Sequence, residues 1–91
     1  MSRKALNILE RMKQTQSGWR PHHFHTLYLG FGYIKVEAKK HDILVHPDYP
    51  QLEKVTIPRH HEELSKAYAR DAIKDIELLL KLEIERDESN E

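Results

Sequence analysis

The stretch HHFHTLYLGFGYIKVEA, residues 22–38, contains the change of period that decides the fold. Its first part places apolar side chains at helical spacing, which predicts a helix. Gly30 and Gly32 follow, and glycine readily adopts the left-handed conformation at which helices end. From Tyr33 on, apolar and polar residues alternate in YIKVEA, and this alternation predicts a half-buried strand. The chain should therefore change from helix to sheet near Tyr33.

Two further strands and a long helix are expected after this strand. HDILVH (residues 41–46) and KVTIP (residues 54–58) are short extended runs rich in β-branched residues. Pro47 and Pro50 bracket the loop between them, because proline cannot continue the ladder of a central strand. Apolar residues recur at helical spacing from Ser65 to about Arg86, which predicts the final helix.

Two helices are expected before the strands. RKALNILERMKQ, residues 3–14, carries an apolar stripe, and Ser2 is the expected N-cap. Pro21 suits the first turn of the second helix. The connections between the strands are too short for parallel crossovers, so the three strands should form an antiparallel meander. The predicted fold is a two-layer α+β domain in the order helix, helix, three strands, helix.

Length and composition indicate a single domain. A chain of 91 residues can build one modest core, and three parts are expected: an N-terminal helical extension (1–18), the main domain (19–86) and an acidic tail (87–91). The absence of cysteine excludes disulfides and thiolate metal sites. No apolar run is long enough to span a membrane and no signal peptide is recognisable, so the expected location is the cytoplasm.

The net charge does not favour any class of partner. Fifteen lysines and arginines balance fifteen acidic residues, whereas a nucleic-acid binder usually shows an excess of positive charge. The distribution is uneven, however. The C-terminal segment EIERDESNE, residues 83–91, carries five acids against one arginine, so the remainder of the chain is mildly basic.

Four segments carry a resemblance to a known family: FHTLYLGFGY (24–33), AKKHDILVHPDYP (38–50), VTIPRH (55–60) and LSKAYARDAIKDI (64–76). In this order and spacing they resemble the HicA toxins, which are small mRNA interferases of bacterial toxin–antitoxin pairs. The resemblance covers about two-thirds of the chain, from Trp19 to Leu80. It implies an α-β-β-β-α fold similar to double-stranded-RNA-binding domains, metal-independent endoribonuclease activity on mRNA, and neutralisation by an antitoxin.

The resemblance also implies that His41 is the catalytic residue. An imidazole titrates near neutral pH, so it can take the proton of a ribose 2′-hydroxyl or give one to the leaving oxygen. Lys39 and Lys40 stand beside it and offer positive charge to a phosphate. Arg59 and His60 follow the third strand and are predicted to bind RNA, because a guanidinium can hold a phosphate through two hydrogen bonds. The simpler interpretation is that all five are solvated residues at a strand end and a helix-entry turn.

The remaining histidines suggest no further site. His22 and His25 lie three residues apart in a predicted helix, so they share a face and could hold Zn²⁺ or Ni²⁺. No third ligand accompanies them at a suitable spacing, and we predict neither a metal site nor a cofactor. His46 directly precedes Pro47 and is expected to form hydrogen bonds within the turn.

The last predicted helix carries more apolar surface than one small sheet can cover. Ile73, Leu78 and Leu82 lie outside its main stripe, and exposed apolar area of this kind often marks an interface. The resemblance implies mRNA and a cognate antitoxin as partners. The apolar surface predicts that this helix packs against a second copy of the chain or against the antitoxin, and no membrane association is expected. The alternative is a non-catalytic module of the same fold that binds RNA or a protein. The near-neutral charge favours it, as does Ala38-Lys39-Lys40 where the HicA family usually has a Gly-Ser pair.

Overall fold

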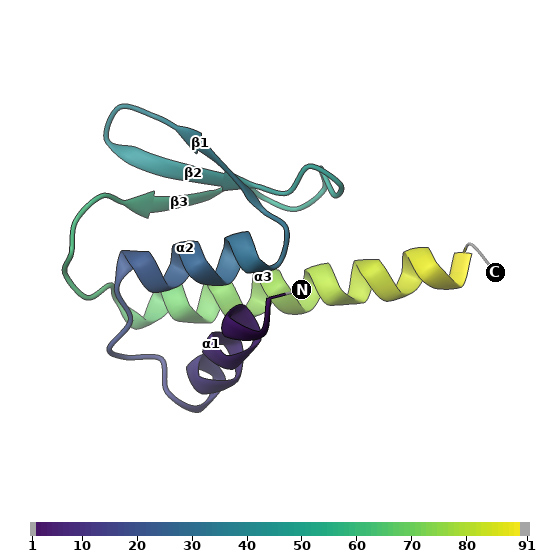
Figure 1. The fold of residues 1–91 in the computed structure, drawn as a ribbon, viewed down its shortest axis with the longest axis horizontal. Helices are drawn as coiled ribbons and strands as arrows, with labels where there is room; N and C mark the ends of the chain where they lie inside the picture. The colour runs from purple at the N-terminus through teal and green to yellow at the C-terminus, as the bar shows by residue number, and fades with distance from the viewer. Residues whose placement is uncertain (1, 90–91) are drawn as a thin grey trace.

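The computed structural model describes residues 2–89 and confirms the predicted α+β fold (Figure 1). α3 continues past its predicted end near Arg86, so the first part of the predicted acidic tail is helical. Residues 90 and 91 of that tail lie outside the described part of the chain. The elements, in chain order, are α1 (Arg3–Gln14), α2 (Pro21–Gly30), β1 (Ile34–Glu37), β2 (His41–Val45), β3 (Val55–Pro58) and α3 (Lys66–Ser89).

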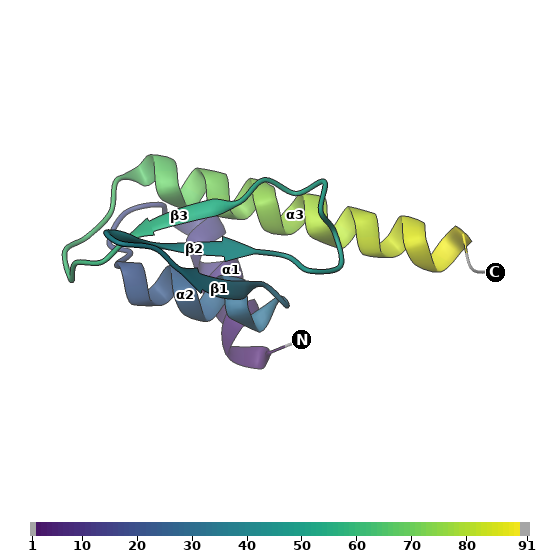
Figure 2. The ribbon, with the colours of Figure 1, turned by 90° about the horizontal axis from the view of Figure 1, so that it is seen from above.

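The three strands form one antiparallel sheet in the order β1-β2-β3. The central strand β2 places Ile43 opposite Val36 of β1, and His41 opposite Pro58 of β3. α2 and α3 lie side by side against one face of this sheet, and α1 packs beneath them on the side away from the strands (Figure 1, Figure 2). Within residues 2–89, no element covers the opposite face, which we call the open face.

The open face of β1 carries aliphatic side chains. Ile34 and Val36 are each 48% exposed there, whereas Tyr33 is only 2% exposed on the covered side. The Tyr33 ring packs edge-on against the rings of Tyr28 and His46, with centroids 4.8 and 5.1 Å away. Because successive side chains of a strand point to opposite faces, burial of Tyr33 turns Ile34 outward. The alternation in the sequence is equally consistent with Tyr33 or with Ile34 on the covered face.

α1 packs closely against α2. The N–H of Ala5 donates to Ser2 Oγ at 3.3 Å, which confirms Ser2 as the N-cap. A Cβ atom on Gly30 would lie 2.3 Å from the Cβ of Ala5, so only glycine permits this approach. Gly32, with φ +98°, is the left-handed residue after α2. The two glycines therefore have different roles, and Gly30 does not supply the left-handed stop expected of it.

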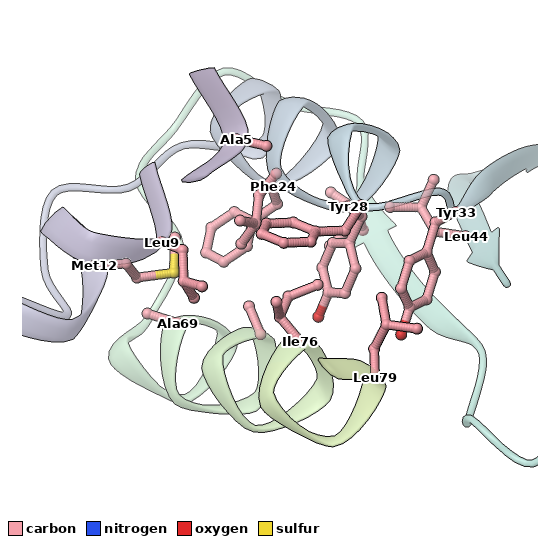
Figure 3. Close-up of a cluster of buried hydrophobic side chains, with 14 of the residues drawn as sticks. Ala5, Leu9, Met12, Phe24, Tyr28, Tyr33, Leu44, Ala69, Ile76 and Leu79 are labelled. Carbon is pink, nitrogen blue, oxygen red and sulfur yellow. The ribbon is translucent and has the colours of Figure 1, made fainter. Parts of the chain in front are cut away.

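The hydrophobic core joins all three helices to the sheet (Figure 3). α1, predicted as an extension, buries Leu9 and Met12 in this core. Complete burial of such a side chain contributes about 1.5–3 kcal/mol to stability, so α1 is an integral part of the folded unit. The other largest fully buried side chains are Phe24, Leu27, Tyr28, Leu44, Ile57, Ile76 and Leu79.

α3 is longer than the body against which it packs (Figure 1, Figure 2). Its 24 residues span about 36 Å at the usual rise of 1.5 Å per residue. The last fully buried residue of α3 is Leu79, and Ile84 is 58% exposed. No helix within residues 2–89 combines the length and the apolar composition needed to cross a membrane.

Candidate functional site

The residues predicted to bind or cleave RNA belong to two connections that meet at one end of the sheet. Lys39 and Lys40 form the turn between β1 and β2, and His41 is the first residue of β2. Because β2 and β3 are antiparallel, His41 lies opposite Pro58, the last residue of β3. The segment that follows β3 therefore begins beside the turn, at the left in Figure 1. We call residues 38–41 and 59–61 the hairpin end.

Arg59 connects the two parts of the hairpin end. Its Nε donates to Asp42 Oδ1 at 2.9 Å, and its Nη2 donates to the carbonyl oxygen of Ala38 in the β1–β2 turn. Among the side chains that the structure describes, its other N–H groups find no hydrogen-bond partner. Arg59 thus fixes the turn against β3, and it offers fewer free donors than the sequence indicated.

The carboxylate of Asp42 is the buried anchor of this arrangement. Burial opposes its ionisation, but the hydrogen bond and charge of Arg59, together with the charges of Lys35 and His25, outweigh burial and hold the pKa of Asp42 below its ordinary value. No sequence motif indicated this pair. The available signal was the alternation along β2, which puts Asp42 on the same face as the buried Leu44. A charged group on a covered face needs a partner.

His25 of α2 approaches the same carboxylate from the helical layer. Its Nε2 lies 3.4 Å from Asp42 Oδ2 without forming a hydrogen bond. Burial lowers the pKa of His25, the attraction of Asp42 offsets only part of this effect, and the charges of Lys35 and His22 add to the lowering. His25 is therefore neutral at pH 7. Asp42 contacts side chains from α2 and from the segment after β3.

The predicted catalytic residue, His41, is exposed at the edge of the open face. Its side chain makes no hydrogen bond with any side chain or backbone group that the structure describes, and the neighbouring Lys39 and Lys40 are also exposed. His60 is exposed as well, and its Nδ1 accepts the N–H of Glu62 at 3.2 Å. The neutral imidazole of His60 therefore carries its proton on Nε2, which can donate to a phosphate oxygen.

Six of the seven histidines lie at or beside the hairpin end. α2 begins next to it, since Arg20 Nη1 donates to the carbonyl oxygen of His61 at 3.0 Å. His46 is the exception: it is buried, and its Nδ1 accepts the N–H of Asp48 at 3.2 Å, which confirms its predicted role in the turn. The six are His22, His23, His25, His41, His60 and His61.

The imidazoles do not form a metal centre within the described part of the chain. Among residues 2–89, no group of three or more His, Asp or Glu side chains is arranged to hold a metal ion. His22 packs against His23 with ring centroids 4.0 Å apart, and His25 faces Asp42. His22 and His25, whose spacing in the sequence would allow a shared metal ion, therefore contact different neighbours.

The balanced net charge conceals a strong separation of charge along the chain. Residues 1–40 carry eight lysines and arginines against two glutamates, whereas residues 71–91 carry eight acids against three lysines and arginines. The first group includes α1, α2 and the β1–β2 turn. The second group includes the C-terminal half of α3, which extends away from the hairpin end (Figure 1). An anionic partner would be attracted to the first region and repelled by the second.

Comparison of the chain with protein-family models, with curated proteins and with solved structures gives no match. The resemblance to the HicA toxins therefore rests on the four sequence segments alone and stays a prediction.

Proposed function

We propose that this protein is a metal-independent endoribonuclease that binds mRNA at the hairpin end and cleaves it with His41 as a general acid or base. One observation carries the proposal: Lys39, Lys40 and His41 lie at the same end of the sheet as Arg59 and His60. A phosphate held there would meet two ammonium groups, an imidazole and part of a guanidinium. Such an activity would place the protein in the cytoplasm, where mRNA is available.

The proposed reaction is an internal transfer at phosphorus. A base removes the proton of the ribose 2′-hydroxyl, the 2′ oxygen forms a bond to phosphorus, and the bond from phosphorus to the 5′ oxygen breaks. The products are a 2′,3′-cyclic phosphate and a 5′-hydroxyl that has gained a proton. His41 can accept the first proton or donate the second. Lys39, Lys40 and Arg59 would stabilise the charge that develops on the phosphate oxygens.

A non-catalytic RNA-binding module is the second candidate, and one observation favours it. Arg59 already donates to Asp42 and Ala38, so much of its hydrogen-bonding capacity serves the fold. Binding would then rest mainly on Lys39 and Lys40. Phosphate attraction alone would account for affinity without cleavage.

Cleavage of a labelled RNA by purified protein separates the two candidates. The enzyme hypothesis predicts cleavage that EDTA does not affect, and a loss of about 10²–10⁴ in rate for His41→Ala. His61→Ala is a matched control, because His61 is also an exposed histidine of the hairpin end and only its backbone carbonyl makes a described contact. Equal cleavage by the folded His41→Ala and His61→Ala proteins would contradict the assignment of His41. RNA binding without any cleavage would favour the second candidate.

The proposal extends to protein partners. A cognate antitoxin would neutralise the activity, and α3 offers the surface that supports an interface with it or with a second copy of the chain. Leu78 is 44% exposed and Ile84 is 58% exposed on this helix, whereas Ile73 and Leu82 are partly buried against the core.

A further inference from the structure

A second cationic surface lies between α1 and the start of α2. It is a groove of about 460 Å³ on the side of the helices away from the sheet. Ile8 and the largely buried Trp19 contribute its apolar wall. The polar side chains that line it are Lys4, Asn7, Arg11, Thr15, Ser17 and His23.

The charged residues of this groove are positive. Lys4 and Arg11 are seven residues apart on one face of α1, which corresponds to a separation of about 10.5 Å along the helix. Neither forms an ion pair with any of the acidic side chains that the structure describes. One acid, Glu63, lies at the end of the groove, where its Oε1 would be 3.6 Å from a Cβ on Gly18. Three other grooves of similar size each contain carboxylates in their lining.

His23 presents a hydrogen-bond donor at this groove. Its Nδ1 accepts the N–H of Arg20 at 3.0 Å, so the neutral ring carries its proton on Nε2. Trp19 fixes the ring edge-on at a centroid distance of 5.1 Å, and the indole N–H itself donates to the carbonyl oxygen of Thr15 at 2.8 Å. The groove therefore combines cationic side chains and neutral hydrogen-bond donors with the apolar side chains of Ile8 and Trp19.

The local electrostatic potential is positive. Burial lowers the pKa of His23, and the charges of His22, Arg20 and Arg11 lower it further. The same field that resists a proton on His23 would favour a bound anion. A phosphate in the groove should in turn raise the pKa of His23.

The groove and the hairpin end are neighbours along one side of the molecule. Arg20, whose N–H contacts His23, also donates through Nη1 to the carbonyl oxygen of His61 at 3.0 Å. His61 follows His60 and Arg59 directly, and Arg59 contacts the β1–β2 turn. A chain of basic residues therefore runs from Lys39 around the start of α2 to the groove.

We propose that the groove between α1 and α2 binds backbone phosphates of the same single RNA strand that the hairpin end binds. This inference rests on the proposed function and adds the path of the substrate. The molecule measures 45 × 32 × 21 Å, so one RNA strand of modest length can extend over both sites. At the roughly 3.4 Å per nucleotide of a stacked strand, 32 Å corresponds to at most about nine nucleotides.

The test measures binding of a 2′-O-methyl oligouridine, which lacks the free hydroxyl needed for cleavage. A strand of about 12 nucleotides is longer than the 32 Å width of the molecule even when stacked, whereas one of about four spans only about 14 Å in that form. The double substitution Lys4→Gln and Arg11→Gln should weaken binding of the long strand about tenfold. It should also reduce the slope of log affinity against log salt by about 0.7 for each lost phosphate contact. The short strand should show a smaller loss, because it does not bridge the two sites.

Arg3→Gln is the matched control. It removes one positive charge from the same helix, half of what the double substitution removes, and Arg3 is exposed and does not line the groove. The control should leave the salt slope unchanged. A loss of affinity from Arg3→Gln equal, per charge removed, to that of the double substitution would show that only the total charge matters, and it would overturn the inference.

NMR titration of His23 gives a readout that is independent of affinity. Adding the long strand should raise the pKa of His23, and Arg11→Gln should raise it in the free protein. An unchanged pKa on RNA binding would place the strand elsewhere and overturn the inference.

Substitutions at the groove and at the hairpin end separate the contributions of the two sites to RNA binding. Loss of binding in Lys39→Gln with Lys40→Gln, but not in the groove variant, would leave the proposed site and remove the groove. Loss in the groove variant alone would keep the groove as a phosphate site and remove the hairpin end. Unchanged binding in both variants, or no binding by the wild type, would reject both.

Discussion

Asp42 lies on the covered face of the sheet, where a carboxylate is stable only with partners. Arg59 supplies a hydrogen bond of 2.9 Å, and His25 approaches to 3.4 Å from the helical layer. This single residue therefore links α2, β2 and the segment that carries the proposed RNA-binding residues. Its contribution is structural, because it holds the hairpin end together from the covered side of the sheet while His41 lies on the open side.

Asp42→Asn should destabilise the protein by about 1–3 kcal/mol at pH 7, since a hydrogen bond to a charged group contributes about that much. The pKa of Asp42 is lower in the folded chain than in the unfolded chain, where it is about 3.9. Its stabilising charge is therefore present above that value and is lost as the pH falls through the folded pKa. The difference between wild type and Asp42→Asn, measured by denaturant unfolding, should shrink in acid. Asp48→Asn, in an exposed loop position, is the control.

His25 adds a second dependence of stability on pH, at a higher pH than that of Asp42. Its pKa is lower in the folded chain than in the unfolded chain, where it is about 6.5. The unfolded state therefore binds the proton more readily, and stability should fall as the pH drops below about 6.5. A stability curve that stays flat from pH 7 to pH 5 in the wild type, or an Asp42→Asn protein as stable as the wild type at pH 7, would contradict this account of the cluster.

At the scale of elements, the sequence predicted the order and type of every helix and strand. Alternation and proline positions were sufficient to locate β1, β2 and β3, and amphipathic spacing was sufficient for the helices. The buried face of β1 was not predictable, because Ile34 and Val36 compete with Tyr33 for the interior and the outcome depends on aromatic packing with α2 and His46. The close contact of α1 with α2 at Gly30 was also missed, because it depends on a residue distant in sequence.

α3 is the helix that the rest of the fold leaves partly uncovered. Its C-terminal half projects beyond the sheet, and Leu78 is 44% exposed (Figure 1). If this surface is an interface between two copies, Leu78→Glu should shift the protein to the monomer, because a charge would be buried without a partner. Light scattering over a range of concentrations measures this shift, and RNA cleavage by the variant should not change.

Leu6→Glu is the matched control for this variant. Leu6 is 38% exposed on α1, so it has similar exposure on another element. Equal dissociation by Leu6→Glu would show a general effect of charge. A wild type that is monomeric at every concentration would rule out self-association through α3.

At the scale of the whole molecule, the fold converts an uneven distribution of charge along the chain into two regions. The basic first part of the sequence forms α1, α2 and the β1–β2 turn, and the acidic last part forms most of α3, including its projecting half. The grouping of Lys39, Lys40 and His41 with Arg59 and His60 could be predicted, because adjacent antiparallel strands bring alternate connections to one end. The engagement of Arg59 by Asp42 and the groove of α1 could not, since both depend on contacts between distant segments.

The most direct test of the central claim is an NMR titration of isotope-labelled protein with the non-cleavable oligouridine, following each backbone amide. The account predicts that the largest shifts occur at Lys39, Lys40 and His41 and at Arg59 and His60. The amides in the projecting half of α3 should not respond. Shifts centred on residues 78–88, or no shifts at RNA concentrations well above those of the protein, would contradict RNA binding at the hairpin end.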